Sequence, residues 1–323
     1  MKGIILCAGR GTRLKPITDS IPKTLLPIAN KTILDRCIDQ LFDVGIHEIA
    51  VVINPSQHQI VEHLQQHPSQ KNISILYQEK ALGILHAMFQ AQSFIGKDDF
   101  VMLLGDNVFS GSLLPLIQSF HGNQGAIYLS KVKNPQEYGI AEVKENQIIS
   151  LEEKPKSPKS NLAVIGVYVF HSTIFETQKV IGLSPRGEYE ITDAIQWLIN
   201  QGYPVAFTIT DEWFMDVGTP ERWLLSNLKL LEMELGTKIN VSDGTWIENC
   251  TLIGPVIIGE KCRLTNTIIG PYVSIQDGSE LYNCVIENSI VGNNVNLREE
   301  TIHHSIFVYN NRFEVRHGGR HND

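Results

Sequence analysis

Two glycines and two basic residues lie close together after the first apolar segment of the 323-residue chain. Residues 4–6 are expected to form a strand, and Gly9 and Gly11 follow it within a few residues. Small residues in such a loop let backbone N–H groups approach a phosphate chain, and Arg13 and Lys23 can add charge-assisted hydrogen bonds. These residue types and this spacing predict a loop that binds nucleotide phosphates.

Two common phosphate-binding motifs do not fit this loop. The dinucleotide fingerprint needs a third small residue, but Leu14 stands in its place after Gly9 and Gly11. The P-loop requires Gly-Lys followed by Ser or Thr, whereas Pro22 precedes Lys23. An ordinary glycine-rich turn between a strand and a helix would explain the two glycines but not the basic residues beside them.

Two carboxylates further along the chain each end an apolar or aromatic segment. Asp106 follows the apolar residues 100–104 and one glycine, and Asp216 follows Trp-Phe-Met at 213–215. Burying a carboxylate is costly unless it is paired or binds a metal, and carboxylates together with substrate phosphates commonly hold Mg²⁺. Either residue alone could be a solvated turn carboxylate. Together, beside a phosphate-binding loop, they predict a magnesium site.

Three further polar residues are candidates for substrate contacts. The Gln78 amide offers a donor and an acceptor side by side, which match the edge of uracil or thymine and also adenine. Lys154, whose backbone the following proline stiffens, could bind an anion, and Glu188 could accept a hydrogen bond from a sugar hydroxyl. The alternatives are an exposed polar residue after a strand, a solvated basic loop, and a carboxylate that favours a helix N-terminus.

The first part of the chain alternates apolar strands with helical patterns, which must position these residues. The expected strands are 4–6, 49–53, 73–77 and 100–104, and the expected helices are 33–44, 57–66 and 83–95. Such alternation predicts an α/β fold with a Rossmann-like, mostly parallel sheet covered on both faces. Ligands bind such sheets at the carboxyl ends of the strands, where the glycine loop and Asp106 are expected.

The rest of the chain has two different patterns. Between residues 111 and 235 we expect strands at 126–132 and 162–170, a hairpin at 140–151, and helices near 172–181, 191–200 and 219–235. After about residue 240, short apolar pairs recur with a spacing near six, often followed by glycine. This spacing is typical of hexapeptide repeats in a parallel β-helix, with about four coils, although a small sandwich with glycine turns is an alternative.

These patterns predict three segments. Residues 1–236 are expected to form one domain, with the helix at 219–235 linking it to the next. Residues 237–312 are expected to form the β-helix, and residues 313–323 a polar tail.

Composition excludes several classes of protein. The net charge of −8 offers no basic face for nucleic acid. The five cysteines are scattered and form no disulfide framework or zinc motif. No apolar run approaches the roughly 18 residues that a membrane span needs, so no membrane partner is expected. The N-terminal residues do not read as a signal peptide, so the cytoplasm is the expected location.

The ordered motifs resemble those of the sugar-1-phosphate nucleotidyltransferases, in particular the long glucose-1-phosphate thymidylyltransferase branch with a C-terminal left-handed β-helix. The resemblance implies that the catalytic residues are Arg13, Lys23, Asp106 and Asp216, with a Mg²⁺ cofactor on the two aspartates. It implies a nucleotide site made of Leu6, Ala8, Gly9, Gly11, Thr12, Arg13, Gln78 and Gly83. It implies a sugar-phosphate site made of Gly139, Glu153, Lys154 and Glu188.

The implied reaction is transfer of a nucleotidyl group from dTTP to glucose-1-phosphate or a related sugar-1-phosphate. A UTP-dependent enzyme is an alternative, because Gln78 alone does not choose the base. A non-catalytic subunit that binds sugar nucleotides is another, although the charged residues that catalysis needs are all present. Because β-helix domains often pack against copies of themselves, a homo-oligomer is expected.

Overall fold

The computed structural model describes residues 1–308 and 311–315. Backbone contacts divide the chain into two compact units. The sheet unit comprises residues 1–10 and 34–214, and the β-helix unit comprises residues 11–33 and 215–323. The domain boundaries expected near residues 236 and 312 stay predictions. The predicted polar tail lies outside the described residues from position 316 onward.

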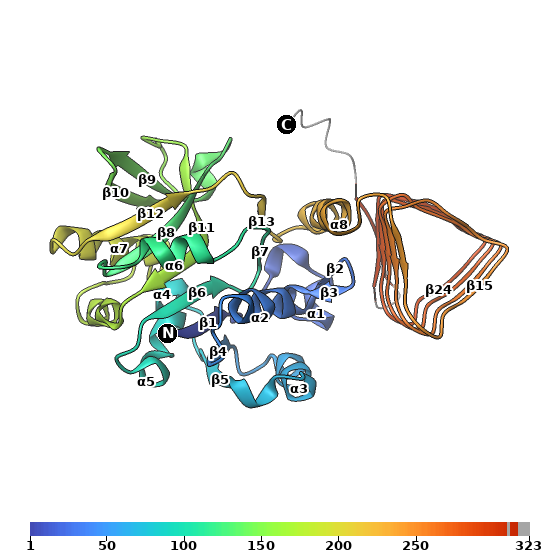
Figure 1. The fold of residues 1–323 in the computed structure, drawn as a ribbon, viewed down its shortest axis with the longest axis horizontal. Coiled ribbons are helices and arrows are strands. Elements are labelled where there is room, and N and C mark those ends of the chain that lie inside the picture. Colours follow the sequence, from blue (N-terminus) through green and yellow to red (C-terminus); the bar gives the residue numbers. More distant parts are fainter. Residues whose placement is uncertain (309–310, 316–323) are drawn as a thin grey trace. The chain divides into compact units, whose positions relative to one another are not determined.

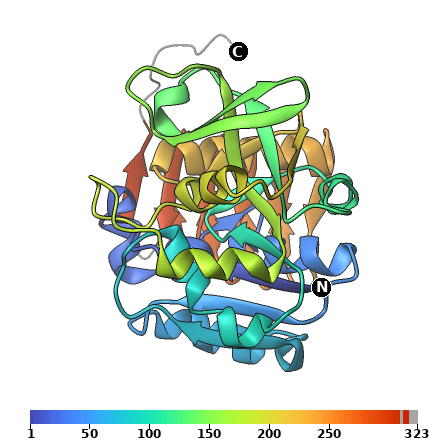
Figure 2. The same ribbon diagram turned by 90° about the vertical axis from the view of Figure 1, so that its left-hand side faces the viewer.

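The sheet unit is built on a nine-stranded sheet (Figures 1 and 2). Its main path runs β10-β9-β11-β6-β1-β4-β5, with β8 beside β11 and β12 beside β8. The strands are β1 (Lys2–Leu6), β4 (Ile49–Ile53), β5 (Ile73–Tyr77), β6 (Phe100–Leu104), β8 (Gly125–Lys131), β9 (Gly139–Lys144), β10 (Gln147–Glu153), β11 (Leu162–Phe170) and β12 (Val205–Ile209). Strands β5, β4, β1 and β6 are parallel, whereas β11 is antiparallel to β6, β8 and β9.

The central parallel strands form where the sequence predicts them because their apolar runs are buried on both faces, whereas β5 at the edge of the sheet is partly exposed. All five residues of β4 are fully buried, as are Ile4 and Ile5 of β1. A continuous apolar run of about five residues between helical segments is typical of a central parallel strand.

The helices of the sheet unit are α2 (Ile33–Asp43), α3 (His58–Gln66), α4 (Ile84–Phe89), α5 (Gln92–Ile95), α6 (Leu114–Ser119) and α7 (Ile191–Asn200), of which Ile33 alone belongs to the β-helix unit. A short strand, β7 (Asn107–Phe109), follows β6. The predicted α/β fold is confirmed.

Two expected helices differ from the structure. The single helix expected at 83–95 is split into α4 and α5, because the backbone hydrogen bonds tighten at its middle. Gln90 N and Ala91 N donate to carbonyls three residues back, and the Gln90 side chain donates to His86 O. The segment Ser172–Lys179 is a 3₁₀ helix rather than an α-helix. No helix among the described residues is long and apolar enough to span a membrane.

The β-helix unit contains three sheets of short parallel strands, one along each face of a prism (Figure 1). One face consists of β14 (Ile239–Val241), β17 (Val256–Ile258), β20 (Val273–Ile275), β23 (Ser289–Val291) and β26 (Ser305–Val308). The second consists of β15 (Trp246–Glu248), β18 (Arg263–Thr265), β21 (Glu280–Tyr282) and β24 (Asn296–Arg298). The third consists of β16 (Thr251–Leu252), β19 (Ile268–Ile269), β22 (Val285–Glu287) and β25 (Thr301–His303). The predicted left-handed β-helix is confirmed. A final strand, β27 (Asn311–Glu314), pairs antiparallel with β26.

Each coil is shorter than three ideal hexapeptides. Ile239 pairs with Val256, a step of 256 − 239 = 17 residues, and Val273 pairs with Ser289, a step of 289 − 273 = 16. At one corner of successive coils, Asn249, Asn266 and Asn283 adopt left-handed backbone angles, with φ of 51°, 53° and 54°. Asparagine tolerates this conformation better than most residues. These asparagines recur once per coil, at steps of 266 − 249 = 17 and 283 − 266 = 17 residues.

One helix, α8 (Pro220–Leu235), belongs to the β-helix unit and begins and ends as its sequence predicts. The Thr219 side chain accepts a hydrogen bond from Arg222 N, Pro220 occupies the first turn, and Gly236 ends the helix with φ of 62°. The same unit contains the 3₁₀ turns Thr12–Leu14 and Lys23–Leu25, helix α1 (Ile17–Ser20), and the strands β2 (Pro27–Ile28), β3 (Lys31–Thr32) and β13 (Phe214–Asp216), of which Phe214 belongs to the sheet unit.

A fully buried asparagine joins three parts of this unit. The Asn227 Oδ1 atom accepts hydrogen bonds from Ala29 N at 2.9 Å and from Ser274 Oγ at 2.7 Å. One turn earlier on α8, Trp223 Nε1 donates to Pro27 O at 2.7 Å. Asn227 therefore ties α8 both to the segment after Lys23 and to strand β20 of the β-helix.

Candidate functional site

A cavity of about 350 Å³ lies at the carboxyl ends of β1, β5 and β6. We call it the charged pocket because its lining includes three charged side chains, those of Arg10, Asp106 and Glu188. Its lining residues are Leu6, Ala8, Gly9, Arg10, Gln78, Ala81, Gly83, Ile84, Ala87, Leu104, Asp106 and Glu188. The predicted site residues of the sheet unit that it gathers are Leu6, Ala8, Gly9, Gln78, Gly83, Asp106 and Glu188.

The register of the two central strands brings Asp106 to this pocket. Leu6 of β1 pairs with Leu104 of β6, so both strands end at the same level. Gly105 then donates its N–H to Leu6 O at 2.9 Å. A side chain at 105 would overlap the Cys7 sulfur, so glycine allows the two strand ends to stay close. The carboxylate of Asp106 therefore emerges beside the glycine loop that follows β1.

The base-reading candidate Gln78 is held from two sides. Its side chain is 4% exposed. The Nε2 atom donates to Gly83 O at 3.1 Å and lies 2.9 Å from His86 Nδ1. Sequence reasoning singled out Gln78 and Gly83 but missed His86, which the first turn of α4 brings back over Gln78.

Gly83 occupies a position that requires glycine. Its φ is +98°, and an added Cβ would lie 2.7 Å from Tyr189 O and 2.9 Å from Glu188 Cβ. Two backbone hydrogen bonds, from Tyr189 N to Leu82 O and from Leu85 N to Tyr189 O, connect the start of α4 to the segment around Tyr189. Glycine therefore allows the start of α4 to approach the segment that carries Glu188.

The predicted sugar-phosphate residues of the sheet unit also converge. Gly139 and Glu153 are direct partners across the β9–β10 pair, and a Cβ at Gly139 would lie 3.0 Å from Glu153 Oε2. Burial raises the pKa of the Glu153 carboxyl, and the nearby Glu190 adds to the rise, against the lowering effect of Lys154 and Arg186. Lys154 itself is exposed, with φ of 45°.

Arg186 was not singled out from the sequence, yet it connects these carboxylates. Its guanidinium lies 3.4 Å from Glu153, 3.5 Å from Glu188 and 3.2 Å from Glu190. The sequence did offer one sign of this contact, because Arg186 stands only two residues before the predicted site residue Glu188. The residues 153, 186, 188 and 190 form one group whose charges partly cancel, which we call the glutamate cluster.

The remaining predicted residues belong to the β-helix unit, where Asp216 is the centre of a cationic group. Lys23 Nζ lies 2.7 Å from Asp216 Oδ1, while Arg13 and Arg222 lie 3.2 Å and 3.6 Å from Oδ2. Burial alone would raise the pKa of the Asp216 carboxyl, but Lys23, Arg13 and Arg222 outweigh burial and hold this pKa below its ordinary value. The Lys23 contact is the strongest, because its side chain is 7% exposed whereas that of Arg13 is 61% exposed.

Two glycines make room for this cationic group. Gly11, with φ of +59°, would place a Cβ 2.8 Å from Thr18 and 3.3 Å from Lys23. Gly218 would place a Cβ 2.6 Å from the Arg13 guanidinium. The predicted residue Thr12 is exposed at the start of the turn that carries Arg13.

The predicted metal ligands are divided between the units, Asp106 in the sheet unit and Asp216 in the β-helix unit. Over residues 1–308 and 311–315, no three His, Cys, Asp or Glu side chains group closely enough to form a metal site on their own. Mg²⁺ is commonly held by only one or two carboxylates that act together with substrate phosphates. Each of the two carboxylates, taken in its own unit, is of the donor type that Mg²⁺ uses together with nucleotide phosphates.

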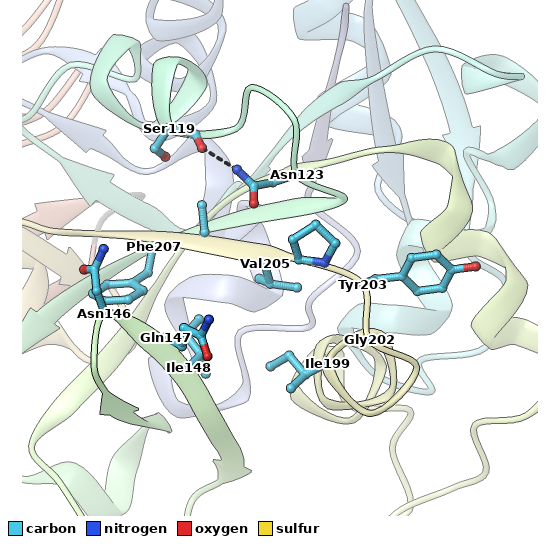
Figure 3. Close-up of a pocket in the computed structure, with 12 residues that line it drawn as sticks. Ser119, Asn123, Asn146, Gln147, Ile148, Ile199, Gly202, Tyr203, Val205 and Phe207 are labelled. Atoms are coloured by element: carbon cyan, nitrogen blue, oxygen red, sulfur yellow. Dashed lines mark hydrogen bonds between the residues drawn. The ribbon is translucent and has the colours of Figure 1, made fainter.

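A second cavity of the sheet unit is larger, at about 610 Å³ (Figure 3). We call it the uncharged pocket, because its lining residues are Ser119, Asn123, Asn146, Gln147, Ile148, Ile199, Gly202, Tyr203, Pro204, Val205, Ala206 and Phe207. Figure 3 shows the Asn123 amide turned toward Ser119, to whose carbonyl it donates at 3.0 Å. No predicted site residue lines this cavity.

Comparison with known proteins identifies the family of the chain. The family model described as nucleotidyl transferase matches residues 2–232, which is most of the chain. The chain belongs to the nucleotidyl transferase family. The predicted enzyme class, a nucleotidyltransferase, is thereby confirmed, and so is the resemblance on which the site residues were chosen.

Relatives of this nucleotidyltransferase match along most of its length. It is 39% identical over 315 residues to the low-salt glycan biosynthesis nucleotidyltransferase Agl11 of Haloferax volcanii, covering 90% of this chain and 87% of that one. It is 34% identical over 320 residues to a glucose-1-phosphate thymidylyltransferase of Streptomyces griseus, covering 94% and 88%. A Bacillus anthracis crystal structure whose title names a glucose-1-phosphate thymidylyltransferase matches with a TM-score of 0.65 at 32% identity, covering 70% of this chain and 94% of that one.

Proposed function

We propose that this nucleotidyltransferase joins dTTP to glucose-1-phosphate, or to a closely related sugar-1-phosphate, and releases pyrophosphate. The observation that carries the proposal is the charged pocket, where Gln78, Asp106 and Glu188 meet at the carboxyl ends of parallel strands. The names of the relatives from Streptomyces griseus and Bacillus anthracis supply the substrate pair.

Each part of the substrate pair has a candidate partner. The Gln78 side-chain oxygen would accept a hydrogen bond from the base. Backbone N–H groups around Gly9 would approach the phosphates, and Arg13 and Lys23 would bind the negative charge of the triphosphate. Lys154 would bind the sugar phosphate, and Glu188 would accept a hydrogen bond from a sugar hydroxyl.

Magnesium is part of this proposal. Asp106 faces the charged pocket, and Asp216 keeps lone pairs beyond those that its three cationic partners use, since a carboxylate offers about four. Both carboxylates therefore suit Mg²⁺, and we propose them as its protein ligands. The ion would polarise the α-phosphate and neutralise charge on it.

The reaction would proceed by in-line displacement at the α-phosphorus. A phosphate oxygen of the sugar-1-phosphate forms a bond to the α-phosphorus, and the bond from that phosphorus to the bridging oxygen of pyrophosphate breaks. No covalent enzyme intermediate is needed, so catalysis consists of positioning and charge stabilisation. Lys23 and Arg13 would stabilise the charge that develops on the departing pyrophosphate.

A UTP-dependent reaction is the second candidate, because Gln78 contacts a part of the base that thymine and uracil share. The thymine methyl group would have to be read by apolar contacts, and one methyl is worth only about 1–3 kcal/mol. Assembly into a homo-oligomer through the β-helix also stays a prediction, and light scattering on the full chain tests it.

The direct test is pyrophosphate release with glucose-1-phosphate and Mg²⁺, run in parallel with dTTP, UTP, ATP, GTP and CTP. Release with dTTP well above the other nucleotides is the expected result, and it should stop when EDTA removes the metal. Preference for UTP would keep the chemistry and change the base. Silence with every nucleotide, together with tight binding of dTDP-glucose in calorimetry, would favour a non-catalytic binding subunit.

A further inference from the structure

The orientation of the Gln78 side-chain amide is fixed by its two neighbours. The amide nitrogen donates to Gly83 O at 3.1 Å, and this carbonyl can only accept. If the amide were rotated by half a turn, its oxygen would face both the Gly83 carbonyl oxygen and His86, and the hydrogen bond would be lost. The assignment of oxygen and nitrogen in this amide therefore follows from its hydrogen-bond partners.

The contact with His86 also fixes which imidazole nitrogen carries the proton. The amide nitrogen of Gln78 has no lone pair to offer, so at 2.9 Å it must donate its second proton to His86 Nδ1. His86 is then neutral, with its proton on Nε2. Burial lowers the pKa of His86, and the charge of Lys80 lowers it further, which keeps the ring neutral near pH 7. Tyr189 stacks on the ring at 6.1 Å and helps to hold it in place.

Both donor protons of Gln78 are therefore used inside the protein. Over residues 1–308 and 311–315, no group donates a hydrogen bond to Gln78 Oε1. Because Gln78 lines the charged pocket, what it offers to a ligand there is an acceptor without a matching donor. This departs from the sequence-based expectation that the amide would offer a donor and an acceptor side by side.

We propose that His86 is a positioning residue for base selection, which holds Gln78 so that only its oxygen faces the base. An acceptor at this place favours thymine and uracil, which carry a proton on N3. Opposite the ring nitrogen it disfavours cytosine, whose N3 is an acceptor, and adenine, whose N1 is an acceptor. Opposite the exocyclic group it would instead accept from their amino groups, so tighter binding of CTP than of UTP would contradict this placement. Guanine carries a ring N–H and is not rejected by this contact. The inference rests on the proposed function only in placing the base of the triphosphate against Gln78.

The test is calorimetric binding of UTP and CTP to the full-length protein, with dTTP alongside. UTP and CTP share ribose and phosphates and differ only in the hydrogen-bonding edge of the base. We expect the unmodified protein to bind UTP about tenfold or more tightly than CTP, since a buried acceptor facing an acceptor loses a hydrogen bond. Binding needs no turnover, so this measurement is independent of the catalytic reaction.

Four variants separate positioning from folding. His86→Leu removes one of the two acceptors of the Gln78 amide nitrogen and leaves only Gly83 O to hold it, so the UTP-to-CTP ratio should fall by about threefold or more. His86→Asn keeps an acceptor near the place of Nδ1 and should retain most of the ratio. His121→Leu changes an exposed histidine elsewhere in the sheet unit and should leave the ratio unchanged. If thermal melting shows that His86→Leu is unfolded, His86→Ala, which suits a helix, takes its place.

Several outcomes would overturn the proposal. An unmodified protein that binds CTP as tightly as UTP would refute it, as would a His86→Leu or His86→Ala variant that keeps the full ratio. Equal loss of the ratio in His86→Asn would show that the acceptor is not what matters. If the expected ratios appear but pyrophosphate is never released, the proposed function fails and the role of His86 stands.

Discussion

Two cavities of the sheet unit differ in size, in chemistry and in their place on the fold. The charged pocket has a volume of about 350 Å³ and is lined by Arg10, Asp106 and Glu188 among others. The uncharged pocket is larger, at about 610 Å³, and its polar lining consists of amides and hydroxyls. The smaller one lies at the carboxyl ends of parallel strands, whereas the larger one lies between the β9–β10 turn, the end of α7 and β12.

Volume alone therefore does not single out the candidate site of this molecule, because the larger cavity lacks charged residues. Residues far apart in the sequence reach the charged pocket because the parallel strands β1, β5 and β6 all end there. The uncharged pocket gathers residues from α6, the β9–β10 turn, β10, α7 and β12, and its Asn123 amide bonds to its own segment at Ser119. Changes in the two pockets should therefore have very different effects.

The largest difference is expected between Asp106→Asn and Gln147→Ala. Loss of the Asp106 carboxylate should reduce turnover by about 10² or more, because a preorganised charge contact is removed from the reacting phosphates. Gln147→Ala in the uncharged pocket should leave turnover unchanged. Steady-state pyrophosphate release measures both, and similar rates for the two variants would break the comparison.

A pair of glycine substitutions compares the backbones of the two pockets. Gly83 and Gly202 both have positive φ, +98° and +77°, so alanine is strained at either place. Only at Gly83 would the new Cβ also meet backbone, at 2.7 Å from Tyr189 O. We expect Gly202→Ala to lower the free energy of unfolding by about 1 kcal/mol, and Gly83→Ala by about 2 kcal/mol or more. Equal losses in urea unfolding would contradict the close approach at Gly83.

The glutamate cluster should make stability depend on pH. The pKa of Glu153 is raised above its ordinary 4.5 in the folded state, mainly by burial and then by Glu190. Between 4.5 and that raised pKa the folded chain binds more protons than the unfolded chain, so this residue lowers stability as pH rises through the window. Glu153→Gln should remove this part of the slope.

Urea unfolding at several pH values above 4.5 measures the slope. Glu152→Gln is the matched control, because its side chain is exposed on the same strand. A slope that is unchanged in Glu153→Gln, or that changes equally in both variants, would show that Glu153 is not the titrating group.

The smallest effect is expected from Asn146→Gly in the uncharged pocket. Asn146 has φ of 62° in the β9–β10 turn, directly after Glu145 with φ of 49°. Glycine suits this position, so unfolding free energy should stay within about 0.5 kcal/mol and the rate should not change. A clear loss of activity in a folded Asn146→Gly variant would give the uncharged pocket a functional role.

The sequence predicted the central strands well and the contacts between side chains poorly. The strands at 49–53, 73–77, 100–104 and 162–170 have the expected bounds. The runs at 49–53 and 100–104 are continuously apolar, which is typical of strands covered on both faces of a sheet. Asp106 and the glycine loop follow from the rule that ligands bind at strand ends. Arg186 contacts Glu153, which lies far away in the sequence, so this part of its role depends on tertiary folding. His86 lies only eight residues after Gln78, but the sequence pattern does not show that its ring turns back onto the Gln78 amide.

Local geometry explains the other differences. The split between α4 and α5 depends on hydrogen bonds that the helical pattern of residues 83–95 does not reveal. The coils step by 17 and 16 residues and not by three ideal hexapeptides, a length that the irregular apolar spacing did not specify. The division of the chain into units was also unexpected, since Arg13 and Lys23 belong with the β-helix and Gly9 does not.

The hydrogen bonds of Asn227 have a consequence for protein engineering. A single oxygen serves the backbone of Ala29, a few residues after Lys23, and the hydroxyl of Ser274 in the β-helix. The C-terminal coils are therefore not an interchangeable module that can be cut off or exchanged after α8. A chimera that replaces them should keep a hydroxyl at position 274, because otherwise the graft alters the anchor of the segment that carries Lys23.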